Sequence, residues 1–153
     1  MNKEMKIVGV APLIAIPTFL YLILTAVISF LTGSVFTITK QKNSVLLLIG
    51  IVIILIGALM VISCSIKLHK SFNSGLLMTD GLYTIFRNPM YAAYLLFVIP
   101  GISLLFNSWL VLSTVIINWL LFFIFIKREH SYLQKKFGSE YEKYLEKVLI
   151  KFL

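Results

Sequence analysis

The sequence predicts an all-α integral membrane protein, a helical bundle with four transmembrane helices followed by short C-terminal amphipathic helices. Two observations support this prediction. Hydrophobic residues make up 59% of the 153 residues, whereas soluble domains are usually about 45–50% apolar. These residues also gather in four runs that each fit the roughly 17–25 residues a membrane-spanning helix needs, although the last two runs are short. We expect a single domain over residues 1–153.

The four predicted spans cover residues 7–31, 44–66, 89–106 and 109–126. The first contains Pro12 and Pro17, which a packed membrane helix tolerates, and it is too long for a cleaved signal peptide. Only Asn107 and Ser108 separate the last two spans. This short separation predicts a tight helical hairpin, in which one of these residues caps the fourth helix.

The distribution of charge predicts the orientation in the membrane. Four spans place both termini on one side, which holds every acidic residue and all of the 14 Lys and Arg except Lys40 and Lys42. Because cytoplasmic loops are enriched in Lys and Arg, both termini are expected in the cytoplasm of a multi-pass cell-membrane protein. The net charge of +8 is therefore a topology signal, and no soluble basic and aromatic segment indicates a nucleic-acid partner.

The segment after the fourth span is amphipathic. Its aromatic and aliphatic residues recur at steps of three and four, with Lys and Glu between them. Gly138 suits a helix end, and Ser139 with Glu142 forms a capping-box pattern. We expect two short helices whose apolar faces lie on the membrane or on the ends of the spans.

A polar junction, TDGLYTIFRNPMY, covers residues 79–91. Asp80 and Gly81 are a turn signal. Pro89 suits the first turn of the third span, and Asn88 before it should be non-helical. Since the third and fourth spans form a hairpin, residues 127–130 should return close to Asn88. Two polar clusters are thus expected to meet at the cytoplasmic rim.

Each polar residue taken alone also fits a structural role. Basic side chains at span ends serve as snorkelling anchors, and aromatic ones form interfacial belts. Glu129 fits a solvated carboxylate, while His69 and His130 fit surface positions without metal-ligand spacing. Cys64 is the single cysteine and fits a packing residue, so no disulfide is expected within the chain.

Together, the two segments resemble the signature of a known group of membrane enzymes. TDGLYTIFRNPMY resembles the pattern T-x-G-x-Y-x-x-x-R-H/N-P-x-Y of the isoprenylcysteine carboxyl methyltransferase family and the related phospholipid N-methyltransferases. EHSYLQKKFGSEYEKY, from residue 129, is similar to the family tail E-E-x-x-L-x-x-x-F-G-x-x-Y-x-x-Y. The resemblance covers about residues 68–148. It implies S-adenosylmethionine as methyl donor, S-adenosylhomocysteine as product, a lipophilic acceptor from the membrane, and no metal.

By position, the resemblance places donor binding in the cytoplasmic elements 68–91 and 127–150. The implied donor-binding residues are Gly75, Leu76, Leu77, Met78, Tyr83, Asn88, Pro89, Met90, Tyr91 and Glu129. A carboxylate such as Glu129 can balance cationic charge through charge-assisted hydrogen bonds. The candidates for a role in catalysis are Arg87, Arg128 and Glu129.

Three positions depart from the family pattern. Asn88 stands where the family often has His, His130 replaces the usual second Glu, and Phe125 replaces an Arg that isoprenylcysteine enzymes carry for the substrate carboxylate. The expected function is methyl transfer from S-adenosylmethionine to a lipid-like or isoprenoid-linked acceptor. The alternatives are phosphatidylethanolamine-type N-methylation and a non-catalytic membrane scaffold. A transporter is disfavoured because no ionisable residue lies at mid-span.

Overall fold

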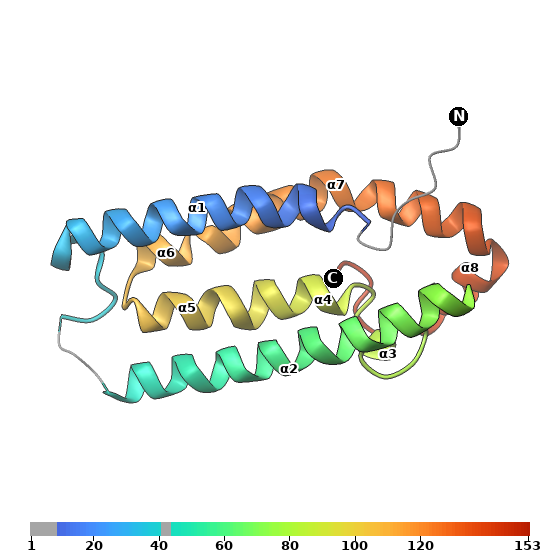
Figure 1. The fold of residues 1–153 in the computed structure, drawn as a ribbon, viewed down its shortest axis with the longest axis horizontal. Helices are drawn as coiled ribbons and strands as arrows, with labels where there is room; N and C mark the ends of the chain where they lie inside the picture. Colours follow the sequence, from blue (N-terminus) through green and yellow to red (C-terminus); the bar gives the residue numbers. More distant parts are fainter. Residues whose placement is uncertain (1–8, 41–43) are drawn as a thin grey trace.

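The protein is a bundle of long helices joined by short connections (Figure 1). The computed structural model describes residues 9–40 and 44–153. The first half contains α1 (Ala11–Leu31), the 3₁₀ turn η1 (Gly33–Phe36) and α2 (Ser44–Ser74). The described residues contain two isolated β-bridges and no β-strand, so the predicted all-α class is confirmed.

The second half of the chain forms the predicted hairpin and a final short helix. Its elements are, in order, α3 (Leu82–Ile85), α4 (Pro89–Ala93), the π-helical stretch η2 (Tyr94–Val98), α5 (Ile99–Leu105), α6 (Trp109–Leu112), α7 (Thr114–Phe137) and α8 (Ser139–Lys147). The elements α4, η2 and α5 follow one another without a break. α1 packs on α6 and α7, whereas α2 packs on α4, η2 and α5.

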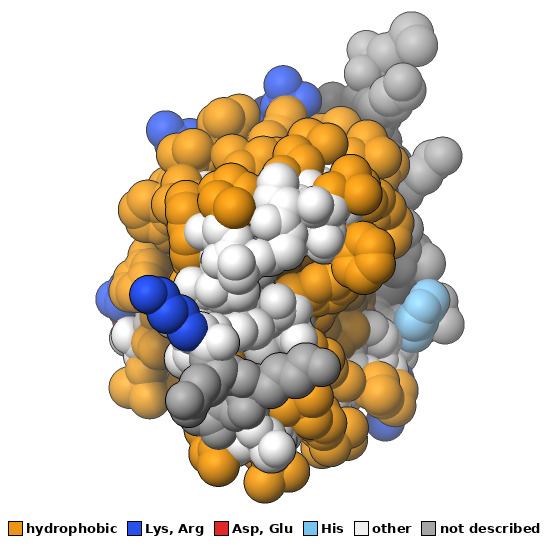
Figure 2. Space-filling view, turned by 90° about the vertical axis from the view of Figure 1, so that its left-hand side faces the viewer, with side chains coloured by type: hydrophobic (Ala, Val, Ile, Leu, Met, Phe, Trp, Pro, Cys, Tyr) orange, Lys and Arg blue, Asp and Glu red, His pale blue; other side chains and the backbone are white. Residues whose placement is uncertain are grey.

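A short turn at Asn107 and Ser108 closes the hairpin. Asn107 has a positive φ of 47°, and the Ser108 hydroxyl accepts a hydrogen bond from the Val111 N–H at 3.3 Å. The predicted cap is thus confirmed at Ser108. The Asn107 side chain also donates to the Thr39 carbonyl at 2.8 Å, which fastens the turn to the segment after η1. Figure 2 views this end of the bundle, where hydrophobic side chains form much of the rim.

Three of the four predicted spans are helices long and apolar enough to cross a membrane: Ala11–Leu31, Ser44–Ser71 and Trp109–Phe137. The remaining predicted span, the third in the chain, corresponds to Pro89–Leu105, a shorter apolar helix of 10–17 residues. At 1.5 Å per residue it is at most about 26 Å long, somewhat less than the roughly 30 Å hydrocarbon core of a typical bilayer. Residues 7 and 8 of the first predicted span lie outside the described residues.

Two helices continue past the ends of the apolar runs that predict the spans. α2 extends beyond the predicted end at Ile66 and stops only before Gly75, which has a positive φ of 70°. α7 likewise passes Ile126 and continues to Phe137. The first of the two expected C-terminal helices is therefore the last part of α7. Polar residues at a membrane surface do not break a helix; glycine in a left-handed conformation does.

The start of α8 also differs from the expectation. Gly138, with φ 48°, ends α7 as predicted, but it is also the N-cap of α8, where no side-chain capping bond forms. The Glu142 carboxylate instead accepts a hydrogen bond from the Gln134 side chain at 2.7 Å. The apolar face of α8 packs against the protein, and its buried members are Tyr141 and Tyr144.

A polar seam joins α1 to α6 and α7 within the bundle. We use this name for three hydrogen-bonded pairs: Thr18 with Asn118, Tyr21 with Ser113, and Thr25 with Thr114. Their side-chain atoms lie 3.2, 3.0 and 3.5 Å apart, respectively. Helices in a bilayer associate partly through such interhelical hydrogen bonds, because apolar contact with a neighbour offers little advantage over contact with lipid.

Glycines allow α2 and α5 to approach closely. A Cβ atom added at Gly101 would lie 2.5 Å from the Ile54 Cγ1 atom and 2.9 Å from the Gly50 carbonyl oxygen. Small residues at such crossings are typical of membrane helix pairs.

We predict that Gly101→Leu lowers the free energy of unfolding by about 1–3 kcal/mol through overpacking at this crossing. The measurement is the midpoint of thermal unfolding in detergent. Ala15→Leu is the matched control, because Ala15 is exposed on α1. Equal midpoints for both variants would contradict close packing of α2 on α5.

Candidate functional site

A cavity of about 390 Å³ opens at the end of the bundle opposite the hairpin turn. Its walls come from the start of α1, the end of α2, the segment from residue 76 to 91, the last part of α7, and α8. Most lining side chains are apolar or aromatic. This volume lies in the range of about 300–1,000 Å³ typical of small-molecule sites.

The cavity brings together most of the residues that the sequence analysis names as donor-binding. Those that line it are Leu76, Leu77, Met78, Tyr83, Asn88, Pro89, Met90, Tyr91 and Glu129. Gly75 does not line it; this residue ends α2 with a positive φ and is exposed. That these residues bind a donor stays a prediction, but their convergence around one space is a property of the fold.

The loop before α4 is shaped by local turn chemistry. Gly81 has a positive φ of 63° where α3 begins, and Pro89 occupies the first turn of α4. Asn88 is non-helical, with φ −130° and ψ 69°, as expected before proline. Lys67 forms an exposed ion pair with Asp80 at 3.0 Å. The hydrogen bond and charge of this ammonium lower the pKa of the Asp80 carboxyl.

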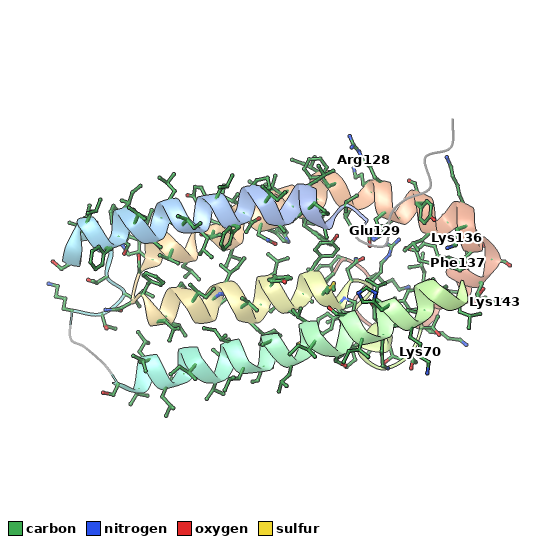
Figure 3. All side chains as sticks on the ribbon, viewed as in Figure 1. Lys70, Arg128, Glu129, Lys136, Phe137 and Lys143 are labelled. Carbon is green, nitrogen blue, oxygen red and sulfur yellow. The ribbon has the colours of Figure 1, made fainter. Side chains whose placement is uncertain are left out.

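Glu129 projects from α7 towards the interior of the bundle (Figure 3). Its carboxylate accepts a hydrogen bond from the Tyr91 hydroxyl at 3.1 Å. The Tyr91 ring in turn packs against Phe122, with ring centroids 5.3 Å apart. Among residues 9–40 and 44–153, no Lys or Arg forms an ion pair with Glu129. A half-buried carboxylate in this position is suited to a cationic group of a ligand, because such a pairing would offset its desolvation.

Asn88 and His130 are in contact. The His130 Nε2 atom lies 3.3 Å from Nδ2 and 3.4 Å from Oδ1 of Asn88. Asn88 is buried and lines the cavity, whereas His130 is half-buried and does not line it. Two of the three departures from the family pattern are therefore one interacting pair.

The two candidate arginines have different surroundings. Arg87 lines the cavity, and its guanidinium donates to the Tyr141 hydroxyl from Nε at 3.1 Å and from Nη2 at 2.8 Å. Arg128 points away from the bundle (Figure 3) and its guanidinium lies 5.6 Å from the centre of the Phe125 ring. Arg128 is not a lining residue. Arg87 and Glu129 are thus the candidates that face the cavity.

Buried tyrosine hydroxyls add hydrogen-bonding groups to the wall. Burial raises the pKa of Tyr83 and Tyr141, and it raises the pKa of Tyr144 to about 12. All three hydroxyls therefore remain protonated at neutral pH. The Tyr144 hydroxyl donates to the Tyr83 carbonyl at 2.9 Å.

Several lining residues were missed by sequence reasoning. They are Gly9, Ala11, Ser65, Leu68, His69, Ser71, Tyr132, Leu133, Lys136, Phe137, Tyr141 and Tyr144. His69, which is predicted to be a surface residue, is exposed and also forms part of the cavity wall. A signal for the α7 members did exist: Glu129, Tyr132, Leu133 and Lys136 follow the spacing of one helical face.

Comparison with known proteins identifies the family. The model of the family described as phospholipid methyltransferase matches residues 44–140. The chain belongs to the phospholipid methyltransferase family. Two similar curated proteins, from Oryza sativa subsp. indica and subsp. japonica, are each named "Probable protein-S-isoprenylcysteine O-methyltransferase". No solved structure matches the chain.

The likeness to these rice proteins is partial. Each is 30% identical over 112 residues, which cover 65% of this chain and 57% of the rice protein. The chain thus spans little more than half the length of these relatives. Within this chain, the phospholipid methyltransferase match begins at the first residue of α2 and ends in the first turn of α8. Most of the cavity wall lies inside the matched region.

We predict that His130→Ala lowers the free energy of unfolding by about 1–3 kcal/mol, because Asn88 would keep a buried amide without its partner. The double variant Asn88→Ala/His130→Ala should cost less than the sum of the single variants, as expected for contacting residues. Thermal unfolding in detergent measures both effects. His69→Ala is the histidine control and should change stability little. Additive single effects would exclude coupling between Asn88 and His130.

Proposed function

We propose that this chain is an integral membrane methyltransferase that uses S-adenosylmethionine and acts on a lipid-like or isoprenoid-linked acceptor, as isoprenylcysteine carboxyl methyltransferases do. Membership of the phospholipid methyltransferase family supports the reaction class. The observation that carries the proposal is the cavity in which the segment 76–91 meets Glu129. We further propose that residues 1–153 form one domain around this site.

The chemistry of the wall fits the proposed donor. Glu129 provides a carboxylate for its cationic groups, and Arg87 and Lys136 provide positive charge for its carboxylate. Lys136 lies two helical turns beyond Glu129 on α7, so these charges are spread along the cavity. Aromatic side chains suited to the flat adenine lie mainly in the part of the cavity wall that the last turns of α7 and α8 form. These are Tyr83, Tyr132, Phe137, Tyr141 and Tyr144.

The donor supplies an electrophilic methyl group, and the acceptor provides the attacking atom. The protein therefore needs no covalent nucleophile of its own. We propose that Tyr91, Asn88 and Glu129 hold the two reactants in line, which is a large source of rate enhancement. The apolar and aromatic wall would exclude water from the reacting groups.

We propose that the protein lies in the cell membrane and that the cavity end of the bundle faces the cytoplasm. Among the described residues, the basic side chains other than Lys40 lie at this end, in the last turns of α2, in the segment around Arg87, and beyond Ile126. Such asymmetry favours a cytoplasmic position. A cytosolic donor would then reach the cavity from water, and a lipophilic acceptor would reach it from the bilayer.

A second candidate is N-methylation of a phosphatidylethanolamine-type lipid. Phe125 favours this alternative, because the resemblance to isoprenylcysteine enzymes implies an Arg at that position for the substrate carboxylate. A third is a non-catalytic scaffold, favoured by the replacement of the second Glu by His130. Copurified S-adenosylhomocysteine, detected by mass spectrometry, would argue against the scaffold.

We predict that the detergent-solubilised protein binds S-adenosylhomocysteine and that Glu129→Gln and Tyr91→Phe each weaken binding about tenfold, or 1.4 kcal/mol. Tyr91→Phe removes the hydroxyl that donates the Tyr91–Glu129 hydrogen bond, and Glu129→Gln removes the negative charge of the accepting carboxylate. Isothermal titration calorimetry measures the dissociation constants. Glu146→Gln and Tyr94→Phe are matched controls, since neither residue lines the cavity. Absence of binding by the wild type, or equal losses in the controls, would refute the proposed donor site.

We predict that the protein transfers a labelled methyl group from S-adenosylmethionine into the organic phase of a membrane lipid extract. Alkali distinguishes the acceptors, because a methyl ester releases labelled methanol whereas an N-methyl group is stable. Release supports the isoprenylcysteine-like reaction, and retention supports the phospholipid reaction. Glu129→Gln should lower the incorporation. Binding of donor without incorporation from extracts containing both acceptor classes would contradict both reactions.

A further inference from the structure

The segment that follows α8 pairs with the loop before α4. Ile150 and Phe86 form an isolated parallel β-bridge. Its hydrogen bonds run from the Leu149 N–H to the Thr84 carbonyl at 3.2 Å and from the Ile150 N–H to the Ile85 carbonyl at 2.8 Å. The Arg87 N–H returns a bond to the Ile150 carbonyl at 3.0 Å. We call residues 148–150 the C-terminal clamp.

The clamp supplies partners that the loop cannot provide itself. α3 has only four residues, so its last carbonyls, including those of Thr84 and Ile85, have little intrahelical hydrogen bonding available. The Arg87 N–H lies in the non-helical stretch between α3 and α4 and likewise needs a partner from elsewhere. Three backbone groups between Thr84 and Arg87 thus receive their hydrogen-bonding partners from one short segment. Without the clamp, these groups would form hydrogen bonds with water instead, and the loop before α4 would become more mobile.

Both the C-terminal clamp and α8 form hydrogen bonds with Arg87. Its backbone N–H is bonded to Ile150 in the clamp, and its guanidinium is bonded to Tyr141 in α8. The Tyr144 hydroxyl lies 2.9 Å from the Tyr83 carbonyl and 3.5 Å from the Arg87 carbonyl. The stretch between Tyr83 and Arg87 is therefore fixed on its backbone as well as on its side chains.

The clamp acts on the cavity from outside. Tyr83, Arg87 and Asn88 line the cavity, but Leu149 and Ile150 do not. Leu149 is 77% exposed, and Ile150 packs against the core cluster that includes Ala92 and Leu95. Val148 is buried beside Tyr141 and Tyr144. The clamp also lies beyond the part of the chain that the family model matches.

We infer that the C-terminal clamp is a positioning element for methyl-donor binding: by fixing the backbone from Thr84 to Arg87, it sets the orientation of Arg87 and Asn88 in the cavity wall. This inference rests on the proposed function. In this inference the residues of the C-terminal clamp contact neither donor nor acceptor. Binding and pairing are reciprocal, so a ligand that requires the ordered loop also stabilises the clamp.

The test uses proline to remove one hydrogen bond with little loss of side-chain packing. Leu149→Pro deletes the N–H that bonds to Thr84, while the exposed Leu149 side chain contributes little burial. Val148 already has φ −67° and ψ 135°, which is compatible with a following proline. Leu149→Ala keeps the N–H and is the matched control. Ile150→Pro is the second variant, with Ile150→Ala as its packing control.

Two measurements on the full chain in detergent define the outcome. Leu149→Pro and Ile150→Pro should weaken S-adenosylhomocysteine binding about tenfold relative to their alanine controls. Hydrogen exchange of a peptide containing Arg87 should accelerate in the proline variants, and bound S-adenosylhomocysteine should slow exchange in the clamp of the wild type. Circular dichroism checks that the helices remain.

The outcomes separate this inference from the proposed function. If the wild type binds S-adenosylhomocysteine and the folded proline variants bind equally well, the clamp has no positioning role. If the alanine variants lose as much affinity as the proline variants, packing rather than pairing is responsible, and the inference is again overturned. If the wild type does not bind, the proposed function fails, and the positioning role fails with it. Faster exchange at Arg87 would then still establish the pairing itself.

Discussion

The short turn between α5 and α6 is the constraint on which the candidate site depends. Asn107 and Ser108 reverse the chain, so α7 must run back along α5, η2 and α4. The contacts that result follow one antiparallel register: Asn88 meets His130, and Tyr91 meets Glu129. In each pair the two residue numbers add to nearly the same total, 218 and 220. A residue inserted into either arm would shift this register and rotate the later side chains by about 100°.

This register places a carboxylate at the edge of an apolar bundle. Glu129 has Tyr91 as a hydrogen-bonding partner, while its neighbour on α7, His130, contacts Asn88 without bringing a second carboxylate. The arrangement concentrates negative charge in the wall at one point and leaves positive charge at Arg87 and Lys136. A carboxylate with a hydroxyl partner is held in place but keeps capacity for a cation. Such a distribution suits a ligand that carries both signs of charge.

Sequence patterns predict the parts of this structure that depend on local information. The apolar runs predict the helices, Asn107 and Ser108 predict the hairpin, and Gly138 predicts the end of α7. The meeting of residues around Asn88 with those around Glu129 follows from the hairpin. The extension of α2 was missed because Lys67, His69 and Lys70 look like a loop, although nothing before Gly75 stops the helix.

The specific long-range hydrogen-bonded pairs could not be predicted from the sequence. Nothing local to Leu149 and Ile150 indicates that they pair with residues more than sixty positions earlier. The contact between Asn88 and His130 was foreseeable only as proximity, not as a hydrogen bond. Tyr141 and Tyr144 show an amphipathic pattern, but that pattern fits burial against lipid as well as burial against protein. The fold decides between these two environments.

The polar seam has a consequence for how α1 contributes to the cavity. Apolar packing alone permits a membrane helix to slide or rotate at small energetic cost, because lipid can replace a neighbouring side chain. The hydroxyl and amide groups of Thr18, Tyr21 and Thr25 with their partners allow far fewer alignments. The polar seam therefore fixes the position of α1 along its axis and its rotation about that axis. These two quantities determine where Gly9 and Ala11 lie in the cavity wall. An element outside the family match is in this way aligned with a cavity whose wall lies mostly inside that match.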